Sequence, residues 1–170
     1  MPVQLTVTQD YPALPAALFA VFGDPAYPPA KYRTLGALSC EVRTHRADDR
    51  EIHVDLERLV CVDLDALPAI VRKLASAQQT MRHDTRWRRR GDGATGELAI
   101  EVVGKPVRIE GTADISPHEG GSRVIFRFEI SSSVPLVGDK IARVFAGQVE
   151  AALARDHEFT RAWLEEHPAR

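Results

Sequence analysis

Apolar and polar side chains alternate along most of the chain, and the period of the alternation divides it into segments. Residues 3–9 alternate with a period of two, which predicts a β-strand. The next segment has apolar side chains at helical spacing, with Pro15 early and Gly23 at its end, and it predicts a helix. A second short helix is expected within residues 24–36. The apolar positions of the first helix are Leu14, Leu18, Val21 and Phe22.

A period of two returns between residues 37 and 133 and predicts six antiparallel strands. One face of such a sheet is apolar and buried, and the other is polar and faces water. Short turns are expected near residues 47–50, 92–93, 104–105 and 119–121. The alternating apolar positions are Leu38, Cys40, Val42, Ile52, Val54, Leu56, Leu98, Ile100, Val102, Val107, Ile109, Ile115, Val124, Phe126, Phe128 and Ile130.

Two segments have helical periodicity instead. Residues 62–78 are too long for a hairpin turn, and four apolar side chains fall at positions i, i+3, i+4 and i+7, which predicts a short helix over part of the sheet. A long helix is predicted over residues ~136–166, because a lone sheet with one apolar face needs such a cover. The four apolar positions are Leu67, Ile70, Val71 and Leu74, and the stripe on the long helix is Ile141, Val144, Phe145, Ala152, Phe159 and Trp163.

One strand, two short helices, six antiparallel strands and a long C-terminal helix follow each other in the order of the α+β helix-grip fold. The phrases YPALPAALFAVFGDPAY and SVPLVGDKIARVFAGQVEAAL resemble an uncharacterised bacterial branch of the START and pollen-allergen superfamily, also called SRPBCC. The resemblance implies a single domain over residues 1–170, with a curved seven-stranded sheet wrapped on the last helix and a cavity between them. Members bind lipids, sterols or polyketides there, and some catalyse cyclisation or dehydration.

Composition narrows the range of partners. A formal net charge of −2 on 170 residues produces no global field that would attract nucleic acid or anionic lipid. Nothing resembles a signal peptide or approaches the ~18 consecutive apolar residues of a membrane span. Two cysteines do not make a disulfide scaffold. We therefore expect a cytoplasmic protein with no stable membrane insertion, while monomer and homodimer are both open.

The stretch RWRRRGDGATG, residues 86–96, contains two signals of phosphate binding. Four arginines surround a tryptophan, and GDGATG fits G-x-G-x-x-G. A dinucleotide site needs a helix after the glycines, whereas ELAIEVV alternates as a strand. The glycines therefore predict a hairpin turn at Asp92–Gly93, and no cofactor is expected.

The arginines belong to the exposed face of their strand. Met81, His83, Thr85 and Trp87 share one parity, and Met81 and Trp87 mark that side as inward. The opposite side carries Arg82, Asp84, Arg86 and Arg88. With the expected turns, Arg88 lies opposite Glu97 and Glu101 lies opposite Arg108. Such pairs favour a ladder of charges over a surface for nucleic acid or an acidic partner.

Searches for a metal site or a nucleophile find little. His53, Asp55 and Glu57 share a strand face, but it is the exposed one, so no metal site is predicted there. Cys40 and Cys61 have opposite parities on their strands, which favours neither a disulfide nor a shared metal.

Polar residues of inward parity are the candidates for chemistry. Arg58 shares its parity with apolar neighbours, and a buried charge is costly unless it is paired. Either these residues have structural roles, with Arg58 reaching the sheet edge, or they contact a ligand. In the second case Arg58 donates to a carboxylate or another polar head group, and His83 is a second anchor. The candidate ligand-binding residues are Arg58, His83, Thr85, Trp87, Ile109, Phe126, Phe128 and Phe145, of which the phenylalanines and Ile109 also suit a plain core.

The function expected is binding or carriage of a small hydrophobic or amphipathic molecule, lipid-like or polyketide-like, between sheet and last helix. A first alternative is a cyclase or aromatase in which His83 or Arg58 polarises a carbonyl. A second is a protein-interaction module whose interior is filled by its own side chains. A binding protein without catalysis is favoured, because no catalytic set emerges from the chain.

Overall fold

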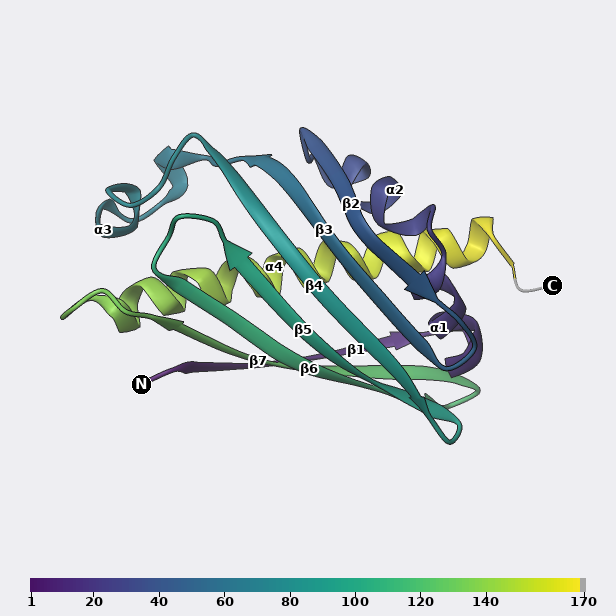
Figure 1. Ribbon diagram of the computed structural model, residues 1–170. Helices are drawn as coiled ribbons and strands as arrows, with labels where there is room; N and C mark the ends of the chain where they lie inside the picture. The colour runs from purple at the N-terminus through teal and green to yellow at the C-terminus, as the bar shows by residue number, and fades with distance from the viewer. Residues whose placement is uncertain (169–170) are drawn as a thin grey trace.

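A seven-stranded antiparallel sheet bends around one long helix (Figure 1). The computed structural model describes residues 1–168. The strands lie in the order β1-β7-β6-β5-β4-β3-β2, so the expected α+β helix-grip fold is confirmed. The elements are β1 (Val3–Tyr11), α1 (Pro15–Gly23), α2 (Tyr27–Thr34), β2 (Ser39–Ala47), β3 (Glu51–Cys61), a 3₁₀ turn (Leu64–Ala66), α3 (Ala69–Arg72), β4 (Gln78–Arg90), β5 (Gly93–Val102), β6 (Val107–His118), β7 (Gly121–Ser132) and α4 (Gly138–Glu166).

The alternation of the sequence becomes rows of side chains that cross the sheet on its inward face. Because every strand pairs antiparallel with its neighbour, each inward residue lies opposite another inward residue. One row crosses six strands through Ile52, Trp87, Gly96, Ala113, Phe126 and Val7, and another through Leu56, His83, Ile100, Ile109, Ile130 and Val3.

The three glycines of GDGATG have three separate steric roles. The turn lies at Gly91–Asp92, one residue earlier than predicted, and Gly91 has the positive φ of 56° that its first position requires. A side chain at Gly93 would collide with the carbonyl oxygen of Ile115 on β6. A Cβ at Gly96 would lie 2.8 Å from the Trp87 ring.

The shifted turn moves the cross-strand partners by two residues and leaves the faces unchanged. Arg86, not Arg88, lies opposite Glu97, and Arg88 lies opposite Thr95. Arg88 instead pairs with Glu51 on β3, with 3.1 Å between Nε and Oε1.

The neighbouring arginines also have carboxylate partners. Arg82 pairs with Glu57 at 2.8 Å and with Glu101 at 3.7 Å. Arg108 lies opposite Glu101 as predicted, but its ion pair is with Glu110 on its own strand, at 2.7 Å. The exposed face is therefore the ladder of charges that was expected.

The long helix α4 uses two adjacent stripes. The stripe in contact with β1 and β7 is mostly small, and its buried members are Ala142, Ala146, Val149 and Leu153. Small side chains let the helix approach the strands closely. Of the predicted stripe, Ile141 and Trp163 are buried, whereas Val144, Phe145 and Ala152 are half-buried and face inward beside the sheet.

The short helices close the ends of the layer between sheet and α4. In α1, Leu18 and Phe19 are buried, while Leu14 precedes the helix and is 61% exposed, contrary to its predicted place in the apolar stripe. The predicted helix within residues 62–78 is the single turn α3, whose Val71 packs with Leu67 against Ile141 of α4. In residues 1–168, no helix has both the length and the apolar character needed to cross a membrane.

A cavity between the sheet and the C-terminal helix

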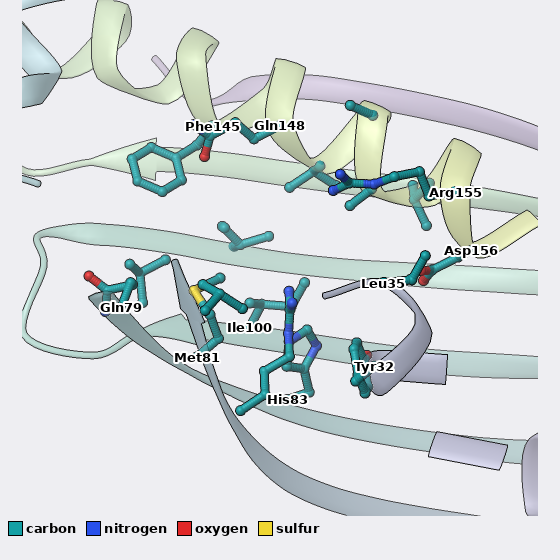
Figure 2. A pocket seen from close by; sticks show the side chains of 18 of the residues that line it. Tyr32, Leu35, Gln79, Met81, His83, Ile100, Phe145, Gln148, Arg155 and Asp156 are labelled. Carbon is teal, nitrogen blue, oxygen red and sulfur yellow. The ribbon is translucent and has the colours of Figure 1, made fainter. Parts of the chain in front are cut away.

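A cavity of about 760 Å³ lies between the inward face of the sheet and α4 (Figure 2). Its walls are mostly apolar side chains of β3 to β7, α3 and α4. Leu35 and Gly36 after α2, Cys61 at the end of β3, and Gln148 on α4 all line the cavity. Of these, Gly36, Cys61 and Gln148 are exposed. The cavity is therefore in contact with solvent near the end of α2, the end of β3 and α4.

All eight candidate residues named from the sequence line this cavity. Arg58 comes from β3, and His83, Thr85 and Trp87 come from consecutive inward positions of β4. Ile109 comes from β6, Phe126 and Phe128 come from β7, and Phe145 comes from α4. In Figure 2, Phe145 projects from α4 toward β4, the strand that carries Gln79 and Met81.

Arg58 and His83 form the polar centre of the cavity. Arg58 Nε donates a hydrogen bond to His83 Nε2 at 2.9 Å, and the guanidinium lies 4.8 Å from the centre of the Tyr32 ring. Burial, followed by the positive charges of Arg58 and Lys31, lowers the pKa of His83 well below its ordinary value. His83 is therefore neutral, with its proton on Nδ1, because Nε2 accepts from Arg58.

Lys31 of α2 has its own counter-ion in the same wall. Its Nζ lies 3.3 Å from Asp156 Oδ2 of α4 and 4.6 Å from the centre of the Tyr32 ring. Burial alone would lower the pKa of Lys31, but Asp156 and the nearby tyrosines raise it well above its ordinary value. Lys31 is thus a charged residue that joins α2 to α4.

Other polar side chains in the wall bond to one another. Tyr11 Oη donates to Gln9 Oε1 at 2.6 Å, and Gln9 Nε2 donates to the carbonyl oxygen of Leu153 at 2.8 Å. Tyr27 and Thr160 share a hydrogen bond of 2.5 Å. Burial raises the pKa of both tyrosines, so both are neutral hydroxyls.

Several lining residues were missed by sequence reasoning. The helix α2 contributes Lys31 and Tyr32, and its position over the sheet edge cannot be read from its own residues. Arg155 and Asp156 on α4 could have been found, since Phe145, Ala152 and Arg155 or Asp156 are spaced by whole helical turns. Figure 2 shows Arg155 reaching from α4 over the same end of the cavity as Tyr32 and His83.

In the part of the chain that the structure describes, the other histidine, carboxylate and cysteine residues considered from the sequence form no metal or disulfide site. His53 Nε2 is 3.1 Å from Asp84 Oδ2 on the exposed face of the sheet. Cys40 and Cys61 are both free thiols, the first half-buried and the second exposed. Within residues 1–168, His, Cys, Asp and Glu side chains do not gather into a group of three or more that could hold a metal ion.

Solved structures share this architecture at low sequence identity. A START superfamily protein of Mycobacterium smegmatis has a TM-score of 0.53 at 12% identity, over 96% of this chain and 97% of that one. An aromatase/cyclase of Streptomyces sp. R1128 has a TM-score of 0.60 at 10% identity, over 97% of this chain and 94% of that one. The expected resemblance is confirmed as a likeness of fold.

Sequence comparison identifies closer relatives. An uncharacterized protein of Mycobacterium tuberculosis is 29% identical over 114 residues, which are 65% of this chain and 66% of that protein, just under two thirds of its length. The model of a family described as a protein of unknown function, DUF2505, matches residues 6–164. That match covers nearly the whole sequence, and the chain belongs to the DUF2505 family.

Proposed function

We propose that this protein binds or carries a small hydrophobic or amphipathic molecule in the cavity between the sheet and α4. The observation that supports it is the cavity itself, because about 760 Å³ lies within the ~300–1,000 Å³ range of ligand pockets. A mostly apolar wall with a few polar groups at one end is typical of such sites. The fold shared with START superfamily members is consistent with this proposal.

The protein-interaction alternative required an interior filled by the protein's own side chains. A volume this large is not left by side-chain packing, since natural cores contain few voids larger than a water molecule. A ligand that removes about 300 Å² of apolar surface from water would contribute roughly 7 kcal/mol before the costs of association. The cavity therefore favours ligand binding.

In this proposal the eight candidate residues named from the sequence divide into two roles. Arg58, His83 and Thr85 contact the polar part of the ligand, and the others contact its apolar part. Those others are Trp87, Ile109, Phe126, Phe128 and Phe145. Trp87 stacks on Phe22 of α1, with 5.2 Å between ring centres.

A cyclase or aromatase is the second candidate, favoured by the guanidinium of Arg58 beside His83 in a cavity of the aromatase/cyclase fold. Arg58 could polarise a ligand carbonyl. Proton abstraction is less well supported, because the free electron pair of His83 accepts the bond from Arg58. Asp156, a carboxylate in the same wall, is engaged by Lys31. These contacts favour binding over catalysis.

We also propose a cytoplasmic location and no nucleic-acid partner. Two free thiols suit a reducing compartment. Three arginines of β4, Arg82, Arg86 and Arg88, are paired with carboxylates of the same sheet face, which reduces the attraction for a nucleic acid.

The proposal is tested with the purified protein and the neutral fluorescent probe N-phenyl-1-naphthylamine. We expect native mass spectrometry to show a bound small molecule, and the probe to bind at one site per chain after that molecule is removed. A protein that carries no small molecule and gives no saturable probe signal would overturn the proposal.

A further inference from the structure

Arg58 is a cation in the wall of the cavity that has no carboxylate partner among the described side chains. Within residues 1–168 it forms no ion pair, and its contacts are the neutral His83 and the Tyr32 ring. Its Nε is used by His83, and its two terminal Nη groups donate to no described protein group. A half-buried guanidinium without a counter-ion lowers the stability of the ligand-free protein, unless a bound anion or water compensates its charge.

Arg155 on α4 is a second cation of the cavity without a carboxylate partner in the described part of the chain. It lines the cavity, it is exposed, and the described residues offer it neither an ion pair nor a side-chain hydrogen bond. Its side chain reaches over the cavity at the end that holds Tyr32 and His83 (Figure 2). Two arginines without carboxylate partners therefore line the cavity, one on the sheet and one on the helix.

The charges around the cavity are unequal. The lining cations are Lys31, Arg58, Lys105 and Arg155, and the lining anions are Asp63 and Asp156. Asp156 is taken by Lys31, and Asp63 accepts a backbone hydrogen bond at the start of the 3₁₀ turn. The surplus of positive charge favours an anionic guest.

We propose that the ligand is an amphipathic carboxylic acid, whose carboxylate is held by Arg58 and covered by Arg155 while its apolar part fills the cavity toward Phe145 and Met81. This inference rests on the proposed function and specifies its ligand class. With Nε fixed by His83, the two Nη groups of Arg58 are a fork that matches the two oxygens of a carboxylate. His83 is then a positioning residue for Arg58, and its Nδ1–H is a free donor.

The apolar direction follows from the walls. The part of the cavity away from Arg155 is lined by Met81, Val102 and Phe145, together with Leu67 and Val71 beside α3. Gln79 also lies there, but its amide donates to the backbone of Thr80 and Val103, so it offers its donors to no ligand. Lys105 lines the cavity on the same side, where its Nζ donates to Ser76 Oγ at 2.9 Å. The other lining side chains that an apolar chain meets at that end are mainly apolar.

The experiment measures displacement of N-phenyl-1-naphthylamine by three ligands with the same chain: dodecanoate, dodecan-1-ol and dodecyl phosphate. We expect dodecanoate to compete best in the wild type. Arg58→Met keeps the apolar stem of the side chain. It should lower the affinity for dodecanoate by about 10- to 100-fold, because hydrogen bonds to a charged group are lost. The affinity for dodecan-1-ol should change by less than about 3-fold in the same variant.

A second variant and a control keep the outcome clear. Arg155→Ala, at an exposed position, should lower the affinity for dodecanoate by about 3-fold, as expected for the loss of one solvent-exposed ion pair. Arg143→Ala on the same helix, outside the cavity, should leave all three ligands unchanged.

The possible failures are distinct. Equal competition by dodecanoate and dodecan-1-ol, or dodecanoate binding that survives Arg58→Met, would overturn the carboxylate assignment while leaving the proposed function standing. Tighter binding of dodecyl phosphate than of dodecanoate would replace the carboxylate with a phosphate head group. Failure of the neutral probe to bind any variant, the wild type included, counts against the proposed function itself.

Discussion

Single glycines determine how the aromatic rings lie on the inward face of the sheet. Trp87 can lie flat against β5 only because Gly96 opposite it has no side chain, and Phe128 lies in the same way over Gly111, where a Cβ would be 2.7 Å from its ring. Each aromatic ring thus occupies the space that a glycine leaves on the neighbouring strand.

Gly96→Ala should destabilise the protein by about 1–3 kcal/mol, because the added methyl group overlaps a ring that cannot move away from Phe22. The free energy of unfolding in urea, followed by tryptophan fluorescence, measures the change. Gly147→Ala is the matched control: nothing lies within 4 Å of its Cβ on α4, so helix propensity should stabilise that variant by up to about 1 kcal/mol. Equal effects of the two substitutions would contradict the steric role of Gly96.

The buried imidazole of His83 makes stability depend on pH. Its pKa in the folded protein is well below the ordinary value near 6.5, so below pH 6.5 the unfolded chain binds a proton that the folded protein does not. Stability is therefore lost as the pH falls through 6.5, by at most about 1.4 kcal/mol between pH 7.5 and 5.5.

His83→Gln, which can still accept the bond from Arg58, should remove this part of the pH dependence. The measurement is the free energy of unfolding at the two pH values for wild type and variant. The same loss of stability in both proteins would show that His83 is not the group responsible.

At the scale of elements, the two adjacent stripes of α4 have different functions. The small residues of α4 contact β1 and β7, and the larger ones beside them line the cavity. The connection between β3 and β4 is less securely held. Its helix α3 is a single turn, and Arg72 ties it together by donating to the carbonyl oxygens of Leu64 and Leu67, both at 2.9 Å.

Arg72→Ala should loosen residues 64–74 without unfolding the protein. Two hydrogen bonds of ~0.5–1.5 kcal/mol each are lost, so hydrogen exchange of these amides should accelerate by roughly 5- to 150-fold. The neighbouring Lys73→Ala is the control, since that side chain makes no hydrogen bond among the described residues. Mass spectrometry of exchanged peptides measures both; uniform acceleration over the whole chain would mean global destabilisation instead.

At the scale of the whole molecule, the cavity arises because a bent sheet and a straight helix cannot touch along their full length (Figure 1). α4 lies close to β1 and β7 and diverges from β3 and β4, and the cavity occupies the space between. α2 and α3 cover the two sides of this space.

Ala152→Phe should fill part of the cavity from the α4 side and abolish probe binding, while the protein stays folded. Burying the added ring offsets the loss of helix propensity, so the unfolding free energy should change by less than about 1.5 kcal/mol. Ala154→Phe adds the same ring to an exposed position of α4 outside the cavity and should leave binding intact. Probe titration and urea denaturation test both variants; undiminished binding by Ala152→Phe would place the ligand elsewhere.

The sequence by itself determined the element order, the faces of the strands and the inward set Arg58, His83, Thr85 and Trp87, because side-chain parity in a strand is a local property. It misplaced the hairpin turn by one residue and assigned Val144 and Ala152 of α4 to the buried stripe, whereas both line the cavity. Only the tertiary structure decided that Lys31 and Asp156 pair, that Arg58 and Arg155 line the same cavity, and that the cavity exists at all. Those features depend on how far the sheet bends and where α2 and α4 cross it, and that geometry is a sum over contacts distant in sequence.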